Sequence, residues 1–159
     1  GGYMSIYYTP NVDQLVQGVQ FQYMGQEGVV DRFPIHFKMC GDVNGAMVSK
    51  NSIIDSYQRC IVLQNTSYAE MTENVAYNTA GHCYTVQDGG ETENLFRNNL
   101  GAKSTRILSP ISGQSDKSPA TYYAGNPNNH WIGNVAAGSY DSGFKIYPYY
   151  KVNEESLPF

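Results

Sequence analysis

NSIIDSYQRCIVL (residues 51–63) and NVAYNTAGHCYTV (residues 74–86) are two copies of one sequence pattern, 23 residues apart. A third copy is NVAAGSYDSGFKI (residues 134–146), and a shorter, weaker copy is NLFRNNLG (residues 94–101). Internal repeats with a period of about 20–50 residues are typical of solenoids, propellers and other arrays. The period therefore narrows the fold to these classes before any single residue is interpreted.

The copies have the composition of short β-strands. They are rich in Val, Ile, Tyr and Thr, their apolar positions alternate, and Gly or Asn separates the strand-like pieces. A propeller blade needs about 40–45 residues, whereas two or three short strands fit one coil of about 20–23 residues. Coils stacked at the ~4.8 Å spacing of paired strands form a parallel β-helix. The sequence therefore predicts an all-β solenoid of this type.

Equivalent residues of the copies are expected to lie above one another along the axis of the β-helix. Stacked asparagines hydrogen-bond along such an axis, so we expect a ladder of side-chain amides at one turn. The predicted ladder consists of Asn51, Asn74, Asn94 and Asn134. Small inward residues at a tight corner are predicted at Cys60, Cys83 and Gly143, and an apolar stack at Ile61, Tyr84 and Phe144.

One coil is expected to carry an inserted loop. Asn94 and Asn134 are 40 residues apart, nearly two coil lengths, and the excess falls in residues 104–125, which are rich in Ser, Pro and Gly. Long loops are either functional or mobile, and both alternatives stay open. The whole chain, residues 1–159, is predicted to be a single β-helix segment. Its abrupt ends, GGYMSIYYTP and NEESLPF, indicate a piece of a larger extracellular protein.

The composition excludes several classes of protein. Of 159 residues, 41% are hydrophobic and only 15% are charged, and 14 Tyr with 6 Phe argue against a disordered chain. A net charge of -4 without a basic cluster argues against nucleic-acid binding. No apolar run approaches the ~20 residues that a membrane span needs, so direct membrane insertion is not expected.

The three cysteines, Cys40, Cys60 and Cys83, form no CxxC pair, so neither a metal site nor a cofactor is expected. Buried free thiols are the simplest interpretation. A disulfide is the alternative, because neighbouring coils bring stacked Cα atoms within the range that a disulfide tolerates. We expect the side chains of Cys60 and Cys83 to lie inside the coil, one above the other.

The stretch RFPIHFKMCGDVNG (residues 32–45) is predicted to contain a strand of the first coils, as is VQFQYM (residues 19–24). Side chains alternate along a strand, and the inward face of a β-helix is apolar. The residues expected inside are Ile35, Phe37 and Met39, and those expected outside on an exposed face are His36 and Lys38. Turns are predicted at residues 41–42 and 44–45.

Four blocks resemble the β-helix region that follows the G8 domain in a family of surface proteins. They are RFPIHFKMCGDVNG (residues 32–45), QRCIVLQNT (58–66), NTAGHCYTVQDGGETEN (78–94) and NPNNHWIGNVAAGSYDSGF (126–144). The family includes fibrocystin, its fibrocystin-like relative, the cell migration-inducing hyaluronan-binding protein and the transmembrane cell-surface hyaluronidase. The resemblance implies a right-handed parallel β-helix in a large extracellular or cell-surface protein. Two members are linked to hyaluronan breakdown, whereas the fibrocystins are receptor-like, with no established enzyme activity.

This chain departs from the hyaluronan-linked members at three places. They read P-I-H-F-H where this chain has Lys38, carry a His after R-C where this chain has Gln64 or a neighbour, and read E-D-G where this chain has Gln87. The retained residues are His36, Asp42, His82 and Asp88, together with the block NPNN (residues 126–129). Loss of two histidines and one acid weakens a catalytic interpretation, because acid–base catalysis needs groups that exchange protons near the working pH.

Catalysis on a polysaccharide would need specific pairs of side chains. A glycoside hydrolase uses two carboxylates about 5–10 Å apart. The candidates are Asp42 and Asp88, with Glu91 as a third. Asp42 and Asp88 both follow a wall strand, at turns two coils apart, which is about 10 Å along the axis. The alternative is that these two acids cap turns. A lyase would use a basic strip instead. The candidates for that strip are Arg32, His36, Lys38 and His82, with solvated wall residues as the alternative account.

Carbohydrate contact is predicted for a second set of residues, which are Trp131, Asn128, Asn129, Arg32 and Lys38. Trp131 either stacks on a sugar ring or plugs the core, and His82 is either a site residue or a corner histidine. Asn65 begins an Asn-Thr-Ser triplet that fits the N-glycosylation pattern and weakly supports secretion.

The sequence favours a non-catalytic extracellular scaffold that contacts carbohydrate over a depolymerase of hyaluronan-like polymers. The expected partners are neighbouring domains of the same protein, or copies in an assembly, together with extracellular polysaccharide. An uncapped β-helix has open ends that must pack on something else, which favours such partners.

Overall fold

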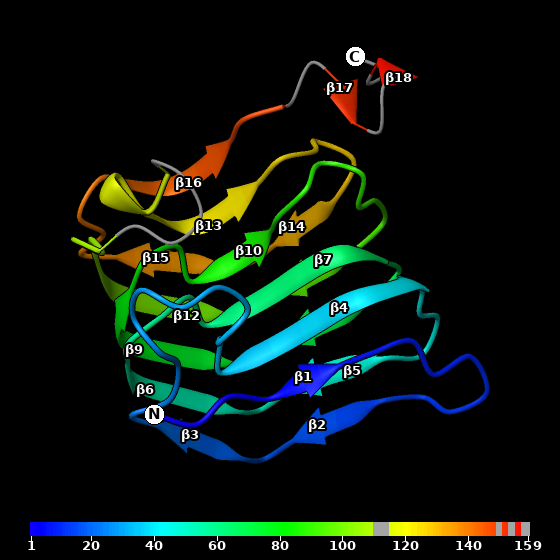
Figure 1. Ribbon diagram of the computed structural model, residues 1–159, viewed down its shortest axis with the longest axis horizontal. Coiled ribbons are helices and arrows are strands. Elements are labelled where there is room, and N and C mark those ends of the chain that lie inside the picture. The colour runs from blue at the N-terminus through cyan, green and yellow to red at the C-terminus, as the bar shows by residue number, and fades with distance from the viewer. Residues whose placement is uncertain (110–114, 149–150, 153–154, 157–159) are drawn as a thin grey trace.

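Strands that follow one another in the sequence lie in different sheets, and each sheet collects one strand from every coil (Figure 1). The structure is a computed structural model that describes residues 1–109, 115–148, 151–152 and 155–156. Three parallel sheets wind around one core, and the predicted right-handed parallel β-helix is confirmed. In the described part of the chain, no helix has the length and apolar character needed to cross a bilayer.

The three sheets are named A, B and C. Sheet A contains β1 (Ser5–Ile6), β4 (Ile35–Asp42), β7 (Ile61–Ser67), β10 (Tyr84–Val86), β13 (Ala120–Ala124) and β16 (Ser142–Ile146). Sheet B contains β2 (Leu15–Gln17), β5 (Met47–Ser49), β8 (Glu70–Thr72), β11 (Leu95–Arg97) and β14 (His130–Ile132). Sheet C contains β3 (Gln20–Gln22), β6 (Ser52–Ser56), β9 (Val75–Ala80), β12 (Leu100–Thr105) and β15 (Val135–Ala137). A separate antiparallel pair, β17 (Lys151–Val152) and β18 (Glu155–Ser156), lies near the C-terminus.

The apolar stack predicted inside the coils is present, with one additional member. Ile61 is paired in register with Tyr84, Tyr84 with Tyr122, and Tyr122 with Phe144. The rings of Tyr84 and Tyr122 lie 4.8 Å apart, and those of Tyr122 and Phe144 lie 4.6 Å apart. Phe144 is 50% exposed because it lies on β16, at the edge of sheet A.

A ladder of asparagine side chains runs along the corner between sheets B and C. Each of the first three Asn residues donates from its backbone N–H and its Nδ2 to the Oδ1 of the Asn one coil later, over 2.9–3.1 Å. The members are Asn51, Asn74, Asn99 and Asn134. The predicted ladder is therefore correct at three positions and wrong at Asn94, whose place is taken by Asn99.

Asn94 belongs to a second, shorter ladder at the corner before sheet B. It donates to Asn129 Oδ1 from its backbone N–H, over 3.1 Å, and from Nδ2, over 3.0 Å. Its own Oδ1 accepts the N–H of Ala69, which stands at the equivalent position one coil earlier. Asn94 and Asn99 thus cap two different corners of the same coil.

The residue before each ladder asparagine has a left-handed backbone, which turns the chain sharply from one sheet to the next. In the main ladder these residues are Lys50 (φ 56°), Glu73 (φ 57°), Asn98 (φ 55°) and Gly133 (φ 64°). Non-glycine residues pay roughly 1–2 kcal/mol for this conformation. The side-chain amide that follows offsets this cost by satisfying buried backbone groups at the bend.

Cys60 and Cys83 form a disulfide between neighbouring coils, with Cα atoms 4.5 Å apart. Both are fully buried, so the predicted stacking inside the coil is confirmed, and free thiols at these two positions are ruled out in favour of the alternative. Cys40 is a buried free cysteine whose Sγ lies 3.3 Å from the carbonyl oxygen of Ile6.

The inserted loop is shorter than predicted. Residues 104–105 still belong to β12 and residues 120–124 form β13, so the excursion covers residues 106–119. Its described part includes a 3₁₀ turn, η1 (Ser115–Lys117), and a backbone hydrogen bond of 3.0 Å from Ile107 to Asp116. Residues 110–114 of the predicted loop lie outside the described residues.

The strand prediction for residues 33–39 was correct in place and wrong in two details. Ile35 and Phe37 are fully buried, but a β-bulge shifts the register between Lys38 and Gly41. Met39 consequently has φ 55° and is 54% exposed, and Cys40 points inward instead. The turn predicted at residues 41–42 is also wrong, because both residues continue β4, whereas a turn does occur at residues 44–45.

Candidate functional site

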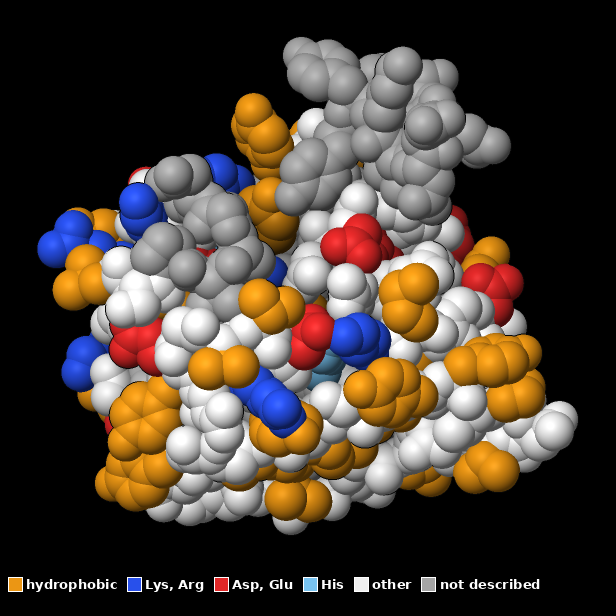
Figure 2. Space-filling model, in the orientation of Figure 1, with side chains coloured by type: hydrophobic (Ala, Val, Ile, Leu, Met, Phe, Trp, Pro, Cys, Tyr) orange, Lys and Arg blue, Asp and Glu red, His pale blue; other side chains and the backbone are white. Residues whose placement is uncertain are grey.

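The outward side chains of sheet A form a column that crosses five coils. Register pairs His36 with Val62, Val62 with Thr85, Thr85 with Tyr123, and Tyr123 with Lys145. The first four are buried, although they point away from the core cluster. The prediction that His36 lies on an exposed face is therefore wrong. Figure 2 views this face, with acidic and basic side chains side by side over the middle of sheet A.

Two segments cover this column. Phe33, from the segment before β4, packs edge-on against His36 with ring centroids 5.0 Å apart. Asp116, from the excursion, reaches over the sheet from the other side to bind Arg59 and the backbone of His82. The part of the outer face of sheet A between His36 and Tyr123 is therefore a second buried layer, with both polar and apolar side chains.

His36 is held in its neutral form. Its Nε2 lies 3.2 Å from Gln64 Oε1, and its Nδ1 has no hydrogen-bond partner among the described residues. Burial lowers the pKa of His36 to about 4, against the attraction of Asp31. At neutral pH the ring is therefore an uncharged part of the packing.

The other members of the predicted basic strip are paired locally. Lys38 forms an ion pair with Asp31, and the hydrogen bond to Asp31 raises the pKa of Lys38. The Arg32 guanidinium lies 3.9 Å from the centre of the Tyr3 ring. Lys38 and Arg32 thus have separate partners, Asp31 and Tyr3, and do not form one continuous basic strip.

Arg59 and Asp116 form a buried ion pair that the sequence analysis missed. Arg59 Nη2 lies 2.6 Å from Asp116 Oδ2, and Nε lies 3.0 and 3.1 Å from the two carboxylate oxygens. Arg59 Nη1 also donates to Gln87 Oε1, over 3.2 Å. Burial acts to raise the pKa of Asp116, but the charge and hydrogen bonds of Arg59 outweigh it and hold that pKa below its ordinary value.

His82 packs beside this ion pair as a corner histidine. Its backbone N–H donates to Asp116 Oδ1 over 3.0 Å, and its Nδ1 accepts the N–H of Ala120 over 2.9 Å. Its ring stacks on Tyr123 with centroids 4.2 Å apart. Burial, followed by the charge of Arg59, lowers the pKa of His82 to about 3, so the ring is neutral at physiological pH.

The candidate carboxylates Asp42 and Asp88 lie at different positions along the strands of sheet A. Asp42 pairs with Ser67 on β7, whereas Asp88 comes just after Gln87, whose N–H bonds to Leu63. Both acids are exposed at the rim of sheet A. The register therefore separates them along the strand direction as well as along the axis.

Glu91 has a structural role. Its carboxylate accepts the backbone N–H groups of Asn65 (2.8 Å), Asp88 (3.0 Å) and Gly89 (2.7 Å). The side chain is fully buried, and burial raises its pKa despite these hydrogen bonds. Glu91 thus fastens the loop after β10 to β7, a role that the sequence did not predict for it.

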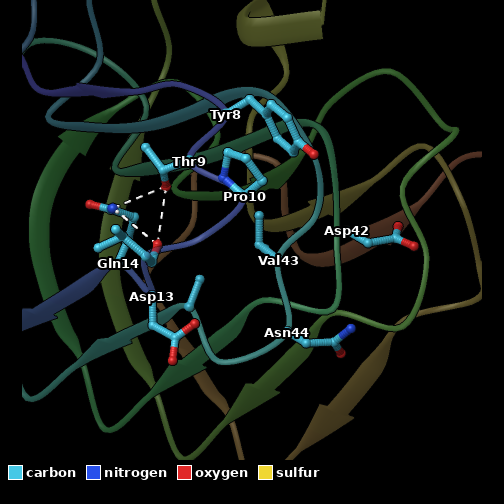
Figure 3. Close-up of a pocket in the computed structure, with 10 residues that line it drawn as sticks. Tyr8, Thr9, Pro10, Asp13, Gln14, Asp42, Val43 and Asn44 are labelled. Carbon is cyan, nitrogen blue, oxygen red and sulfur yellow. Dashed lines mark hydrogen bonds between the residues drawn. The ribbon is translucent and has the colours of Figure 1, made fainter.

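Asp42 lies at the rim of a cavity of about 220 Å³ near the N-terminal coil. Other lining residues include Tyr8, Thr9, Asp13 and Gln14, and Gln14 Nε2 donates to Thr9 Oγ1 over 3.0 Å. In Figure 3 the Asp42 side chain points away from Thr9 and Gln14. This hollow does not bring Asp42 toward Asp88, which is not among its lining residues.

The predicted carbohydrate contacts divide between core and surface. Trp131 stacks on Phe96, with centroids 4.2 Å apart, and packs against the core, as its core-plug alternative predicted. Asn129 is a buried ladder residue, whereas Asn128 is exposed. Asn65 is exposed too, and its glycosylation stays a prediction. The described residues contain no cluster of His, Cys, Asp and Glu that would hold a metal ion.

Comparison with known proteins shows which family and which proteins this chain is similar to. The family model described as CEMIP beta-helix matches residues 1–157. Communication mutant protein F of Dictyostelium discoideum is 36% identical over 143 residues, which cover 80% of this chain and 13% of that protein. The cell surface hyaluronidase of Danio rerio is 32% identical over 154 residues, covering 79% of this chain and 11% of that protein.

The human protein cell surface hyaluronidase CEMIP2 is 30% identical over 154 residues, which cover 79% of this chain and 11% of that protein. The chain thus spans only 11–13% of these relatives. Because the family model covers nearly the whole chain and the stacked coils carry the expected pattern, the chain belongs to the CEMIP beta-helix family.

Proposed function

We propose that this chain is a non-catalytic β-helix module of a larger cell-surface or secreted protein, where it acts as a structural and interaction scaffold. One observation carries the proposal. The basic side chains and histidines on the outer face of sheet A each contact another residue of this chain: His36 contacts Gln64, Lys38 pairs with Asp31, and Arg59 and His82 both contact Asp116. Groups fixed in this way do not face a substrate.

The two wall histidines and Glu91 are not suited to act as general acid or base in catalysis. Both wall histidines have lowered pKa values and lack a titration near neutral pH. Glu91, a carboxyl whose pKa is raised, is buried under three backbone N–H groups. A hydrolase needs an acid with a raised pKa that also reaches the glycosidic oxygen.

Contact with neighbouring parts of the same protein, or with copies of it, is supported by the last strands of each sheet. Ile132, Val135 and Phe144 are each about half exposed on β14, β15 and β16, which end sheets B, C and A. Among the residues that the structure describes, no further strand pairs with β14, β15 or β16. Exposed apolar side chains beside such strand edges are a surface that another β-coil covers well. Contact with extracellular polysaccharide remains part of the proposal, with exposed polar residues such as Asn128 as candidates.

The second candidate function is depolymerisation of a hyaluronan-like polysaccharide. It is favoured by the two relatives named cell surface hyaluronidase and by the exposed Asp42 and Asp88. If the protein were a hydrolase of this kind, one of these carboxylates would have to act as acid and another group as base or nucleophile.

The test is the chain length of hyaluronan after incubation with the purified full-length protein. The scaffold proposal expects polymer of unchanged length, whether or not the protein binds it. Shortening that disappears in Asp42→Asn or Asp88→Asn, and persists in the matched surface variant Asp141→Asn, would overturn the proposal in favour of the hydrolase. Shortening that persists in all three variants would not depend on these two carboxylates and would leave the scaffold proposal standing.

A further inference from the structure

We propose that Asn65 carries an N-linked glycan, which projects from sheet A between the coils that carry Asp42 and Asp88. The inference rests on the proposed extracellular location and adds a modification site to it. Three independent observations support it: the sequence triplet, the exposure of Asn65 at a bend, and the buried disulfide.

The triplet Asn65-Thr66-Ser67 is the only Asn-x-Ser/Thr pattern in the 159 residues. The other asparagines lack a hydroxyl residue two positions later, so the acceptor is unambiguous. The attached sugar chain is bulky and well hydrated, so the acceptor side chain must lie on the surface.

The side chain of Asn65 meets this requirement. Asn65 lies on β7 with a left-handed backbone (φ 44°) and is exposed, whereas its neighbour Thr66 is fully buried. Its backbone N–H is satisfied by Glu91 Oε1, and among the described contacts its side-chain amide makes no hydrogen bond. This is the reverse of the ladder asparagines, whose amides hold neighbouring coils together. A glycan on Asn65 therefore replaces no contact.

The disulfide between Cys60 and Cys83 supports the compartment in which this modification occurs. Disulfides of this buried, structural kind form in oxidising compartments such as the lumen of the endoplasmic reticulum. Asparagine glycosylation of secreted proteins belongs to the same route. If the chain forms the disulfide between Cys60 and Cys83 in the lumen of the endoplasmic reticulum, Asn65 is exposed there to the enzyme that attaches N-linked glycans.

The position of the glycan bears on function. β7 lies between β4, which ends at Asp42, and β10, which precedes Asp88. Gln87 N–H bonds to the carbonyl of Leu63, which brings Asp88 to the level of Asn65 on the neighbouring coil. A sugar chain at Asn65 occupies the surface that a polysaccharide would have to cross to touch both acids.

The experiment uses the full-length protein secreted from eukaryotic cells. The fragment between Arg59 and Arg97 contains no Lys or Arg, so trypsin releases residues 60–97 as one peptide with Asn65, Cys60 and Cys83. Enzymatic removal of N-glycans in water enriched in heavy oxygen should convert Asn65 to labelled Asp. Without reduction, the same peptide should be lighter by one pair of hydrogens, which reports the disulfide.

Variants make the assignment specific. Asn65→Gln and Ser67→Ala should each lose the glycan and its gel shift, while Ser67→Thr should keep it. Asn78→Gln is the matched control, because Asn78 also lies at a bend but bonds to Asp55. Unlabelled Asn65 in the secreted protein would overturn the inference. That result leaves the scaffold role standing, since the scaffold role fails only if hyaluronan is shortened in a way that depends on Asp42 or Asp88.

Discussion

Arg59 Nη2 and Asp116 Oδ2 lie 2.6 Å apart, although 57 residues separate the two side chains in the sequence. Arg59 precedes β7 in the wall, and Asp116 belongs to the excursion between β12 and β13. Side-chain exposure is 4% for Arg59 and 3% for Asp116, so water does not screen the pair. This contact fastens the excursion to the outer face of sheet A.

Replacing Asp116 with Ala should destabilise the protein strongly, because it leaves the guanidinium of Arg59 buried without its counter-charge. Breaking such a pair from one side costs about 3–5 kcal/mol. Urea unfolding of the purified chain measures the loss. The matched control is Asp141→Asn, whose partner Lys145 is partly exposed at 3.6 Å, and which should change stability by less than about 1 kcal/mol. Equal effects of the two variants would contradict the buried role of Asp116.

Substitution of Asn74, an internal member of the ladder, should destabilise the protein more than substitution of an asparagine outside the ladder. Asn74→Ala removes the donor to Val48 O (2.9 Å) and the acceptor for the N–H and Nδ2 of Asn51. Leaving buried groups unsatisfied should lower the free energy of unfolding by about 3 kcal/mol. Asn98→Ala, at the exposed bend residue nearby, is the comparison and should cost well under half as much, so a similar loss in both would argue against the ladder.

Stability should fall in mild acid because of the two wall histidines. The folded-state pKa values of His36 (about 4) and His82 (about 3) lie below the ordinary value of 6.5, so the unfolded chain binds protons first as the pH drops. Their contribution is complete above pH 6.5 and is lost progressively toward these lower values. For His36 the loss approaches about 3 kcal/mol near pH 4.

Unfolding measured at a series of pH values in His36→Gln tests this account. The variant should lose part of the acid sensitivity, because Gln has no proton to bind. His130→Gln is the control, since His130 is exposed and paired with Glu93 at 2.8 Å. An acid profile of His36→Gln that matches the unmodified protein would show that His36 is not the cause.

Removing the disulfide should weaken the central coils. Its cysteines are 23 residues apart, and the loop-closure model gives about 3 kcal/mol for a loop of this length. Cys60→Ala combined with Cys83→Ala should therefore lower the unfolding midpoint in urea, whereas Cys40→Ala should lower it less. Loss of stability on reduction of the unmodified protein, but not of the double variant, completes the test.

The fold was predictable because two features of the repeat indicate it independently: the spacing of the copies, and the strand-forming residue types within each copy. Asn51, Asn74 and Asn134 begin copies of equal length, so their alignment also gave their stacking. The same reasoning failed at NLFRNNLG, where Asn94 and Asn99 both resemble a copy start and the excursion separates the remainder of the copy, β13, from it. Only the hydrogen bonds separate the two corners.

The site was less predictable for a physical reason. Alternation along a strand shows which side chains leave the core, and it assigned His36 and Lys38 correctly to the outer side. It does not show whether another segment covers them. Phe33 covers His36, and Asp31 pairs with Lys38. Asp116 covers Arg59 and His82 further along the same face, and it comes from a segment with no strand pattern. Arg59, an ordinary charged residue in a repeat copy, gave no signal of its buried role.

The spacing of the ladder asparagines in space does not depend on the number of residues between them in the sequence. Successive members are 23, 25 and 35 residues apart, yet each amide reaches the next over the same 2.9–3.1 Å. Extra length added after Asn99 leaves the coil as the excursion and returns at β13, and neither the height of the step nor the order of the stack changes. A corner of this β-helix therefore holds a long insertion while the coils beneath it keep their spacing, because each coil is fixed by its own ladder contacts and not by the length of chain between them.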